Sequence, residues 1–214
     1  MSRIITRSSS NIRLIGKAPQ SQYVCRRFVI EPGMMSMHTL PDGYAITPAA
    51  PEDIPDLVFT DLAASQLFAG TGFIPDDELT DHVPIASLEA AIDPGHLIVA
   101  RYKGDPVGFA MTSIREKTLY LDQISVDPKH SRKGLGAALI AQVRKDAVRR
   151  GLGSVTLSTF RDVPWNGPYY HRLGFRELPR WRMRRWMREI EAAQAENGLD
   201  VTRRCFMVRR AGWL

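Results

Sequence analysis

The sequence predicts an α/β (α+β) protein with a mixed central sheet and helices on both of its faces. After a short strand, two helical segments precede two strands that are joined by a short turn as an antiparallel pair. A strand, a helix and another strand come next, and a helical crossover of this kind joins parallel strands. The predicted sheet is mixed because it contains both kinds of pairing.

Each element is predicted from its local pattern. Acidic Glu52 and Asp53 lie where a helix begins, and Asp93-Pro94-Gly95 ends a second helix because the residue before a proline avoids helical angles. Lys103-Gly104-Asp105 forms a hairpin turn, and Gly151 caps a later amphipathic helix. The predicted strands span about residues 43–48, 96–101, 106–111, 119–126, 154–159 and 205–208, and the predicted helices about residues 51–66, 84–92, 134–150 and 181–196.

The overall composition is that of an ordinary globular protein. Of the 214 residues, 44% are hydrophobic and 24% are charged, and no apolar run approaches the roughly 18 residues that a membrane span needs. Cys25 and Cys205 have no spacing typical of a zinc site or a disulfide framework. We therefore expect no membrane insertion, no bound metal and a reducing, cytoplasmic location.

The positive charge is concentrated at the start of the chain. The first forty residues hold six basic side chains and one acidic one, whereas the remainder holds 23 basic and 22 acidic ones. We expect a basic, disordered extension over residues 1–42 and one folded domain over residues 43–214. The extension fits an organelle transit peptide, a disordered arm, or upstream sequence included through a wrong start codon, which Met34, Met35 and Met37 suggest.

Residues 131–137 have the composition of an anion-binding turn. Ser131-Arg132-Lys133-Gly134-Leu135-Gly136-Ala137 follows a strand and opens a helix, where unpaired backbone N–H groups and the helix dipole attract a phosphate. The glycines allow a close approach, and Arg132 and Lys133 add positive charge. The segment lacks Gly-Lys-Ser/Thr and follows a late strand, which excludes a P-loop and a dinucleotide-binding fold. Taken alone, the turn fits a plain strand-to-helix connection equally well.

Together with a second segment, this turn resembles the GCN5-related N-acetyltransferase (GNAT) superfamily, in which a strand is followed by Gln/Arg-x-x-Gly-x-Gly/Ala and a helix. Tyr170-His171-Arg172-Leu173-Gly174-Phe175 is similar to the family's Tyr-x-x-x-Gly-Phe segment, and Asn166 precedes it. A helix and a strand separate the two segments, as in the family. The resemblance covers about residues 44–210 and implies a mixed, mostly antiparallel central sheet of six to seven strands.

The resemblance implies an enzyme that transfers an acetyl or short acyl group from acyl-CoA to a primary amine of a small molecule, by direct attack. Acetyl-CoA is then the co-substrate, with its pantetheine arm between the strand that ends at Val126 and the strand at residues 154–159. Ser131 replaces the family's Gln or Arg, so we expect weaker acyl-CoA binding. The residues that the resemblance assigns to acyl-CoA are Ile124, Val126, Ser131, Arg132, Lys133, Gly134, Leu135, Gly136, Ala137 and Asn166.

Tyr170 is the expected general acid, because it matches the family tyrosine and a phenol keeps its proton at neutral pH. Tyr169 is the second choice. Tyr120 stands where several family members have a glutamate, and Asp122, the nearest carboxylate on that strand, is the candidate base. The ordinary interpretations are a packed tyrosine with a solvated hydroxyl and a solvated ion pair between Asp122 and an arginine. A water chain to solvent is the alternative base.

Several other polar residues near these segments keep ordinary interpretations. His130 is expected to be an exposed turn residue, while Arg161 and Trp165 fit acceptor binding and a structural role equally well. Residues 180–186 interleave arginines with tryptophans, but acidic residues follow, so a solvated helix face is favoured over nucleic-acid binding. The expected partners are acyl-CoA and an amine, with a homodimer as an option and no nucleic acid. A non-catalytic acyl-CoA-binding protein is the alternative function.

Overall fold

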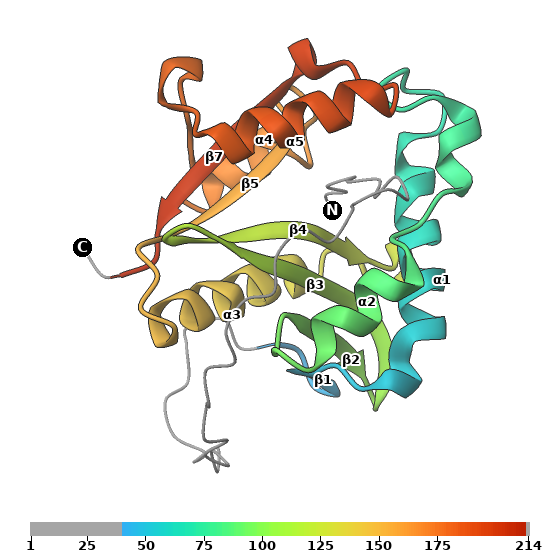
Figure 1. Cartoon of the computed structure of the whole chain (residues 1–214). Helices are drawn as coiled ribbons and strands as arrows, with labels where there is room; N and C mark the ends of the chain where they lie inside the picture. The colour runs from blue at the N-terminus through green and yellow to red at the C-terminus, as the bar shows by residue number, and fades with distance from the viewer. Residues whose placement is uncertain (1–39, 213–214) are drawn as a thin grey trace.

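The computed structural model describes residues 40–212, and within this range seven strands form one sheet (Figure 1). The strands are β1 (Tyr44–Pro48), β2 (Leu97–Tyr102), β3 (Asp105–Arg115), β4 (Thr118–Val126), β5 (Ser154–Phe160), β6 (Arg176–Glu177) and β7 (Arg204–Arg210). The helices are α1 (Ile54–Ser65), α2 (Ile85–Ile92), α3 (Leu135–Arg149), α4 (Gly167–Arg172) and α5 (Arg185–Glu196). The predicted extension over residues 1–42 lies outside the described residues except for its last three, so the division into extension and domain stays a prediction.

The sheet is mixed and mostly antiparallel, as predicted. Its strand order is β1-β2-β3-β4-β5-β7-β6, and among the pairs formed within residues 40–212 only β4 and β5 run parallel. These consecutive strands are joined by α3, so their parallel direction follows from the helical crossover. The β2–β3 hairpin turns at Lys103 and Gly104, whose φ angles of 52° and 104° are the positive values that a tight hairpin turn requires.

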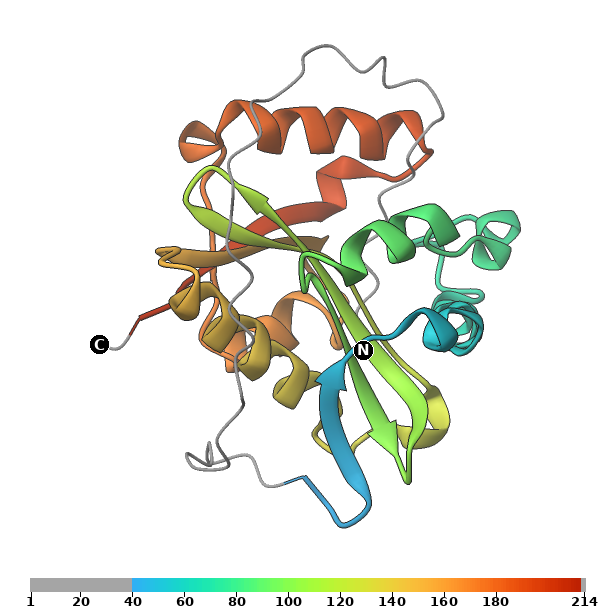
Figure 2. The same cartoon turned by 60° about the horizontal axis from the view of Figure 1, so that its bottom comes forward.

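One face of the sheet is covered by α1, α2 and α5 (Figures 1 and 2). Leu57 of α1 and Leu88 of α2 pack on Phe109 of β3, whereas α5 packs against Tyr120 and Phe206 further along the sheet. The contacts with Phe109 place α1 and α2 over the first half of the sheet. The contacts with Tyr120 and Phe206 place α5 over its second half. None of the helices within residues 40–212 is long and apolar enough to cross a membrane.

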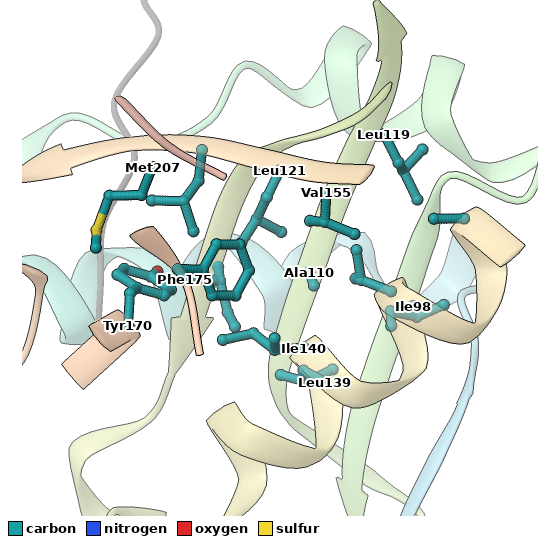
Figure 3. Packing of buried hydrophobic residues seen from close by; sticks show 14 of the residues in the cluster. Ile98, Ala110, Leu119, Leu121, Leu139, Ile140, Val155, Tyr170, Phe175 and Met207 are labelled. Carbon is teal, nitrogen blue, oxygen red and sulfur yellow. The ribbon is translucent and has the colours of Figure 1, made fainter. Parts of the chain in front are cut away.

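The opposite face is covered by α3 and α4, which bury the largest apolar cluster. Leu139 and Ile140 of α3 pack against Ala110 and Val155 of the sheet, and Tyr170 of α4 lies at the other end of the cluster (Figure 3). The alternation of side chains along each strand explains why neighbouring residues belong to clusters on different faces. Helices therefore cover both faces, as the sequence predicts.

β4 and β5 separate part-way along their length. Their pairing ends at Leu121 and Leu157, although β4 continues to Val126 and stays paired with β3 up to that residue. Figure 1 shows the two strands side by side at one end and diverging toward the other. The edge of β4 that faces β5 therefore has no strand partner in the described sheet from Asp122 to Val126.

Two predicted boundaries differ from the structure by four residues. The helix predicted over residues 181–196 begins at Arg185, because residues 180–182 form a separate 3-10 turn and Met183 and Arg184 have extended backbone. The strand predicted over residues 106–111 continues to Arg115, since β3 pairs with β4 along the whole hairpin. For β3, pairing with the neighbouring strand and not local periodicity decides where the element ends.

Candidate active site

The predicted anion-binding turn connects β4 to α3. After a 3-10 turn at Pro128–His130, Arg132 and Gly134 have positive φ angles of 60° and 79°. The Ala138 N–H donates to the Gly134 carbonyl at 3.0 Å, which is the first hydrogen bond of the helix. The amides of Leu135, Gly136 and Ala137 precede it and lie at the open end of α3. These N–H groups and the helix dipole give this end of α3 a partial positive charge that favours an anion.

Around the turn, the cationic side chains are exposed and the apolar side chains are buried. Arg132 and Lys133 are exposed, and Ser131 is half-buried. Leu135 is buried in the apolar cluster, together with Ile124 and Val126 of β4. Ile124 and Val126 therefore offer their backbone, not their side chains, to the gap between β4 and β5. The structure brings this open backbone edge directly to the turn.

Tyr169 reaches the first turn of α3 from α4. A Cβ on Gly136 would lie 2.8 Å from the Tyr169 hydroxyl oxygen. Burial raises the pKa of Tyr169 to about 12, although Arg172 opposes this shift. The phenol is therefore a protonated hydrogen-bond donor beside the anion site at neutral pH.

Asp122 lies in a β-bulge of β4. Met111 pairs with Gln123 and the next residue, Thr112, pairs with Leu121, so the register skips Asp122. A bulge bends the strand and redirects the side chain of the extra residue. This bulge coincides with the place where β4 parts from β5, which puts Asp122 at the start of the gap.

The Asp122 carboxylate is buried, with one oxygen bound and one without a partner. Oδ1 accepts a hydrogen bond from the Ser113 hydroxyl at 3.0 Å, whereas Oδ2 has no hydrogen-bond partner among the described residues. Burial raises the pKa of Asp122 to about 6, and the Ser113 hydrogen bond and the Arg115 charge lower it less strongly. The ordinary interpretation of Asp122 as a solvated ion pair with an arginine is wrong, because the carboxylate is buried and bound to a serine.

Tyr120 is part of an aromatic cluster. Its ring centroid lies 5.4 Å from that of Trp186 and 6.4 Å from that of Phe206. The side chain is fully buried, and burial together with the nearby Asp122 raises the pKa of its phenol. Tyr120 therefore fills space at the position where the family resemblance places a glutamate, and stays protonated there.

Tyr170 and Asn166 are held at the start of α4. The Tyr170 N–H donates to the Asn166 carbonyl at 2.9 Å, and both residues are fully buried. The Tyr170 ring packs edge-on against Phe175 with a centroid distance of 5.6 Å (Figure 3). A tyrosine that simply packs with its hydroxyl in water does not describe Tyr170, because the whole side chain is covered.

The segment that contains these features matches the model of the Acetyltransferase (GNAT) family over residues 62–175. The match extends from α1 through β4 and the turn to the end of the Tyr170–Phe175 segment, more than half of the chain. The chain belongs to the GNAT acetyltransferase family. It is thus a GNAT N-acetyltransferase.

Solved structures share the GNAT fold with this acetyltransferase. The PaiA N-acetyltransferase from Thermoplasma acidophilum, in complex with coenzyme A, matches 78% of this chain and 98% of its own with a TM-score of 0.61 at 13% identity. The ribosomal-protein-S18-alanine N-acetyltransferase from Escherichia coli matches 80% and 96%, with a TM-score of 0.56 at 16% identity.

A third structure is only partly covered by the match. The N-acetylglutamate synthase from Neisseria gonorrhoeae, complexed with coenzyme A and N-acetyl-glutamate, matches 79% of this chain but 35% of its own, with a TM-score of 0.60 at 17% identity. The chain therefore spans about a third of that protein's length. At these identities the likeness shows a common fold.

Two other predicted residues have structural partners in this acetyltransferase. Arg161 forms an ion pair with Glu177 at 3.1 Å and also donates to the carbonyls of Thr202 and Arg204. Trp165 packs in an apolar cluster that contains Phe68. These contacts favour the structural interpretation over acceptor binding.

His130 is also tied into the fold. Its Nδ1 lies 2.9 Å from the Tyr44 hydroxyl, and its ring packs against Tyr44 and Tyr102. The expectation of an ordinary exposed turn residue is therefore wrong: His130 links β1 to the turn that opens α3.

A buried polar network next to the bulge is not foreseen from the sequence. The Asp61 carboxylate of α1 accepts hydrogen bonds from Gln123 Nε2 at 2.6 Å, Ser125 Oγ at 2.7 Å and the Val83 N–H at 2.9 Å. This network fixes α1 and the segment before α2 to β4. The alternating polar residues 123 and 125 within an otherwise apolar strand are the signal that could have indicated it.

Within residues 40–212, no three His, Cys, Asp or Glu side chains are grouped so that they could hold a metal ion.

Proposed function

We propose that this acetyltransferase moves an acetyl or short acyl group from acyl-CoA to a primary amine of a small molecule, by direct attack of the amine. The observation that carries the proposal is the open edge of β4. It runs from Asp122 to Val126 and leads directly into the anion site at the start of α3. An extended ligand with amides along its length and a diphosphate at its end fits both parts.

The proposed acyl-CoA site is built mainly from backbone. The amides of Leu135, Gly136 and Ala137 would hold the diphosphate, with Arg132 and Lys133 as flanking cations. The β4 edge at Ile124 and Val126 would pair with the pantetheine amides as a strand does. Ser131 and Asn166 complete the proposed set. Acyl-CoA supplies the acyl group as a thioester, whose carbonyl carbon the amine attacks.

Asp122 is the proposed general base. An amine must lose a proton before its nitrogen can attack, and a base is most effective when its pKa lies near the working pH. The pKa of Asp122, raised to about 6 by burial, leaves the carboxylate mostly ionised at neutral pH. Ser113 holds Oδ1, so Oδ2 is the oxygen that accepts the proton.

Tyr170 is the proposed general acid, which protonates the departing thiolate sulfur. Its side chain belongs to the cluster on the α3 and α4 face, whereas Asp122 binds Ser113, close to Met111 in the cluster under α1 and α2. The two groups thus approach the gap from opposite faces of the sheet. In this arrangement the amine enters from the α1 face, and the proton for sulfur comes from the other.

The experiment is release of free CoA thiol from acetyl-CoA by the purified full-length protein, measured with a panel of primary amines. We expect amine-dependent release that the Asp122→Asn variant loses. Glu116→Gln is the matched control, because Glu116 is an exposed acid at the nearby β3–β4 turn.

Binding of CoA is measured in the same preparations. CoA binding without thiol release from any amine supports the non-catalytic alternative, which the substitution of Ser131 for Gln or Arg motivates. Absence of CoA binding at submillimolar concentration contradicts both functions.

A further inference from the structure

Arg204, at the start of β7, carries a buried positive charge. The residue is 4% exposed, and none of the acidic side chains within residues 40–212 lies within ion-pair distance of it. Its Nε donates to Gln194 Oε1 at 3.0 Å, and Nη2 lies 3.3 Å from the Ser158 carbonyl oxygen. The guanidinium also lies 4.6 Å from the centroid of the Phe160 ring. Burying a cation without a countercharge is costly, so this arrangement calls for an explanation.

One buried hydrogen-bond donor of Arg204 and one of its neighbour Gln194 are unsatisfied among the described residues. Gln194 Oε1 accepts from both Arg204 Nε and Ser158 Oγ, which fixes the orientation of the Gln194 amide. Gln194 Nε2 and Arg204 Nη1 are both buried and have no hydrogen-bond partner among the described residues. Buried polar groups are rarely left in this state, and such a pair indicates a missing acceptor.

Both residues line one small cavity. Its volume is about 20 Å³, which is room for one water molecule or one oxygen of a larger group. The charged residues at its rim neutralise one another, since Arg161 pairs with Glu177 and Arg180 pairs with Glu191. Among the charged residues that line this cavity, Arg204 has no acidic partner within the described residues. The cavity therefore favours an anion.

The cavity is lined by residues of β5, β6, β7 and α5, and it lies along β5 beyond the point where the pairing with β4 ends. Ser158 directly follows Leu157, the last residue of β5 that pairs with β4. Burial lowers the pKa of Arg204 to about 10, and the nearby Tyr120 and Tyr170 partly oppose this shift, so the guanidinium is protonated at neutral pH. Gln194 belongs to α5, on the same face of the sheet as α1 (Figure 2). This is the face from which the proposed function brings the amine.

We propose that Arg204 and Gln194 bind a carboxylate of the acceptor, so that the amine substrates of this enzyme are amino acids. One carboxylate oxygen takes the place of a water in the cavity and accepts from Arg204 Nη1 and Gln194 Nε2. A neutral water would satisfy the donors but leave the buried charge uncompensated, whereas a carboxylate does both. The inference rests on the proposed function, because it names the class of amine that the proposed transfer uses.

The experiment compares acceptors that differ only in the carboxylate. An ω-amino acid and its carboxamide are offered to the full-length wild-type protein with acetyl-CoA, and kcat/KM is measured for each. We expect the amide to be poorer by a factor of about ten or more, because it cannot pair with the guanidinium. Arg204→Met and Gln194→Leu should remove this preference by raising KM for the acid, while KM for acetyl-CoA stays unchanged. Arg185→Met is the control, since Arg185 is an exposed arginine of α5 that pairs with Glu189.

A second readout keeps this inference separate from the proposed function. Carboxylic acids without an amine, such as propionate and glutarate, should raise the melting temperature of the wild-type protein but not of Arg204→Met or Gln194→Leu. Equal use of the acid and the amide by the wild type contradicts the carboxylate site even though the enzyme acetylates amines. If no amine is acetylated, the proposed function fails and the melting temperatures alone decide about the site. In that case, if the carboxylic acids do not raise the melting temperature of the wild type, the carboxylate site is overturned.

Discussion

The hydroxyl oxygen of Tyr169 lies 2.8 Å from the point at which a Cβ would project from Gly136. Tyr169 belongs to α4, whereas Gly136 belongs to the first turn of α3. The second glycine of the turn is therefore required by a contact with another helix. The same contact places a phenol beside the amides that we assign to the diphosphate.

Gly136→Ala should weaken CoA binding. The new methyl group displaces either the Tyr169 ring or the first turn of α3. If this overpacking costs the bound state about 1 to 3 kcal/mol, Kd rises by roughly fivefold to a hundredfold. Titration of the purified variant with CoA measures the effect.

Tyr169→Phe removes the clashing hydroxyl and should restore part of the affinity in the Gly136→Ala background. If the double variant binds CoA no better than Gly136→Ala alone, the contact with Tyr169 is not the cause of the loss.

Tyr170→Phe should lower kcat and leave CoA binding intact. The ring still fills its place against Phe175, so the fold is preserved, but the proton for the thiolate is lost. General acid catalysis contributes roughly a hundredfold or more, and we expect a loss of that order in kcat. Steady-state kinetics with a saturating amine measure it.

Tyr120→Phe is the matched control for this prediction. The Tyr120 hydroxyl is buried without a hydrogen-bond partner among the described residues, so its removal should leave kcat and stability close to the wild type. Equal losses of kcat in the Tyr120 and Tyr170 variants would contradict the role of Tyr170.

The two short segments that carry the proposed acyl-CoA site could be predicted because their chemistry is local. A strand, a glycine-containing turn and a helix N-terminus are neighbours in sequence, and the anion site follows from that order alone. The Tyr170–Phe175 segment is likewise continuous. The central β4–α3–β5 crossover was predicted to within a residue or two for the same reason.

Features that depend on contacts across the fold could not be predicted. The burial of Asp122 results from a bulge whose position is set by the partner strand, and no residue pattern within β4 indicates it. Arg204 begins a strand, a position that usually faces solvent, and it is buried because Gln194 and Phe160 enclose it. The contact between Tyr169 and Gly136 likewise joins two helices that are separated by a strand.

Gly167→Ala should destabilise the protein. A Cβ at this position would lie 2.1 Å from the Arg161 carbonyl oxygen and 3.1 Å from that of Phe160. Both are backbone atoms, one in the last residue of β5 and one directly after it, so neither can move away without shifting the main chain. We expect a loss of roughly 2 to 4 kcal/mol in the free energy of unfolding, measured by denaturant titration.

Gly153→Ala serves as the control for Gly167→Ala. There the nearest atom to a new Cβ is the Lys117 carbonyl oxygen at 3.9 Å, an ordinary contact distance. If Gly167→Ala and Gly153→Ala have similar free energies of unfolding, the close approach at Gly167 is relieved without loss of stability.

The pH dependence of activity follows from the pKa of Asp122. A base acts in its ionised form, so kcat/KM of the wild type should rise as the pH increases through about 6, the value to which burial raises the pKa of this carboxyl. In Asp122→Asn the low residual activity should lack this rise. If kcat/KM of Asp122→Asn still rises with pH at the same midpoint as the wild type, the titration belongs to another group.

The raised pKa of Asp122 also lowers the stability of the folded protein at neutral pH. Because the folded state holds the Asp122 proton more tightly than the unfolded state, this group lowers the free energy of unfolding as the pH rises from about 4 through about 6. With the pKa raised from 3.8 to about 6, the cost at neutral pH is roughly 3 kcal/mol. Asp122→Asn keeps an acceptor for the Ser113 hydroxyl and removes the charge. Its free energy of unfolding should therefore exceed that of the wild type near pH 8 and approach it near pH 4, a convergence that denaturant titrations at the two pH values can test.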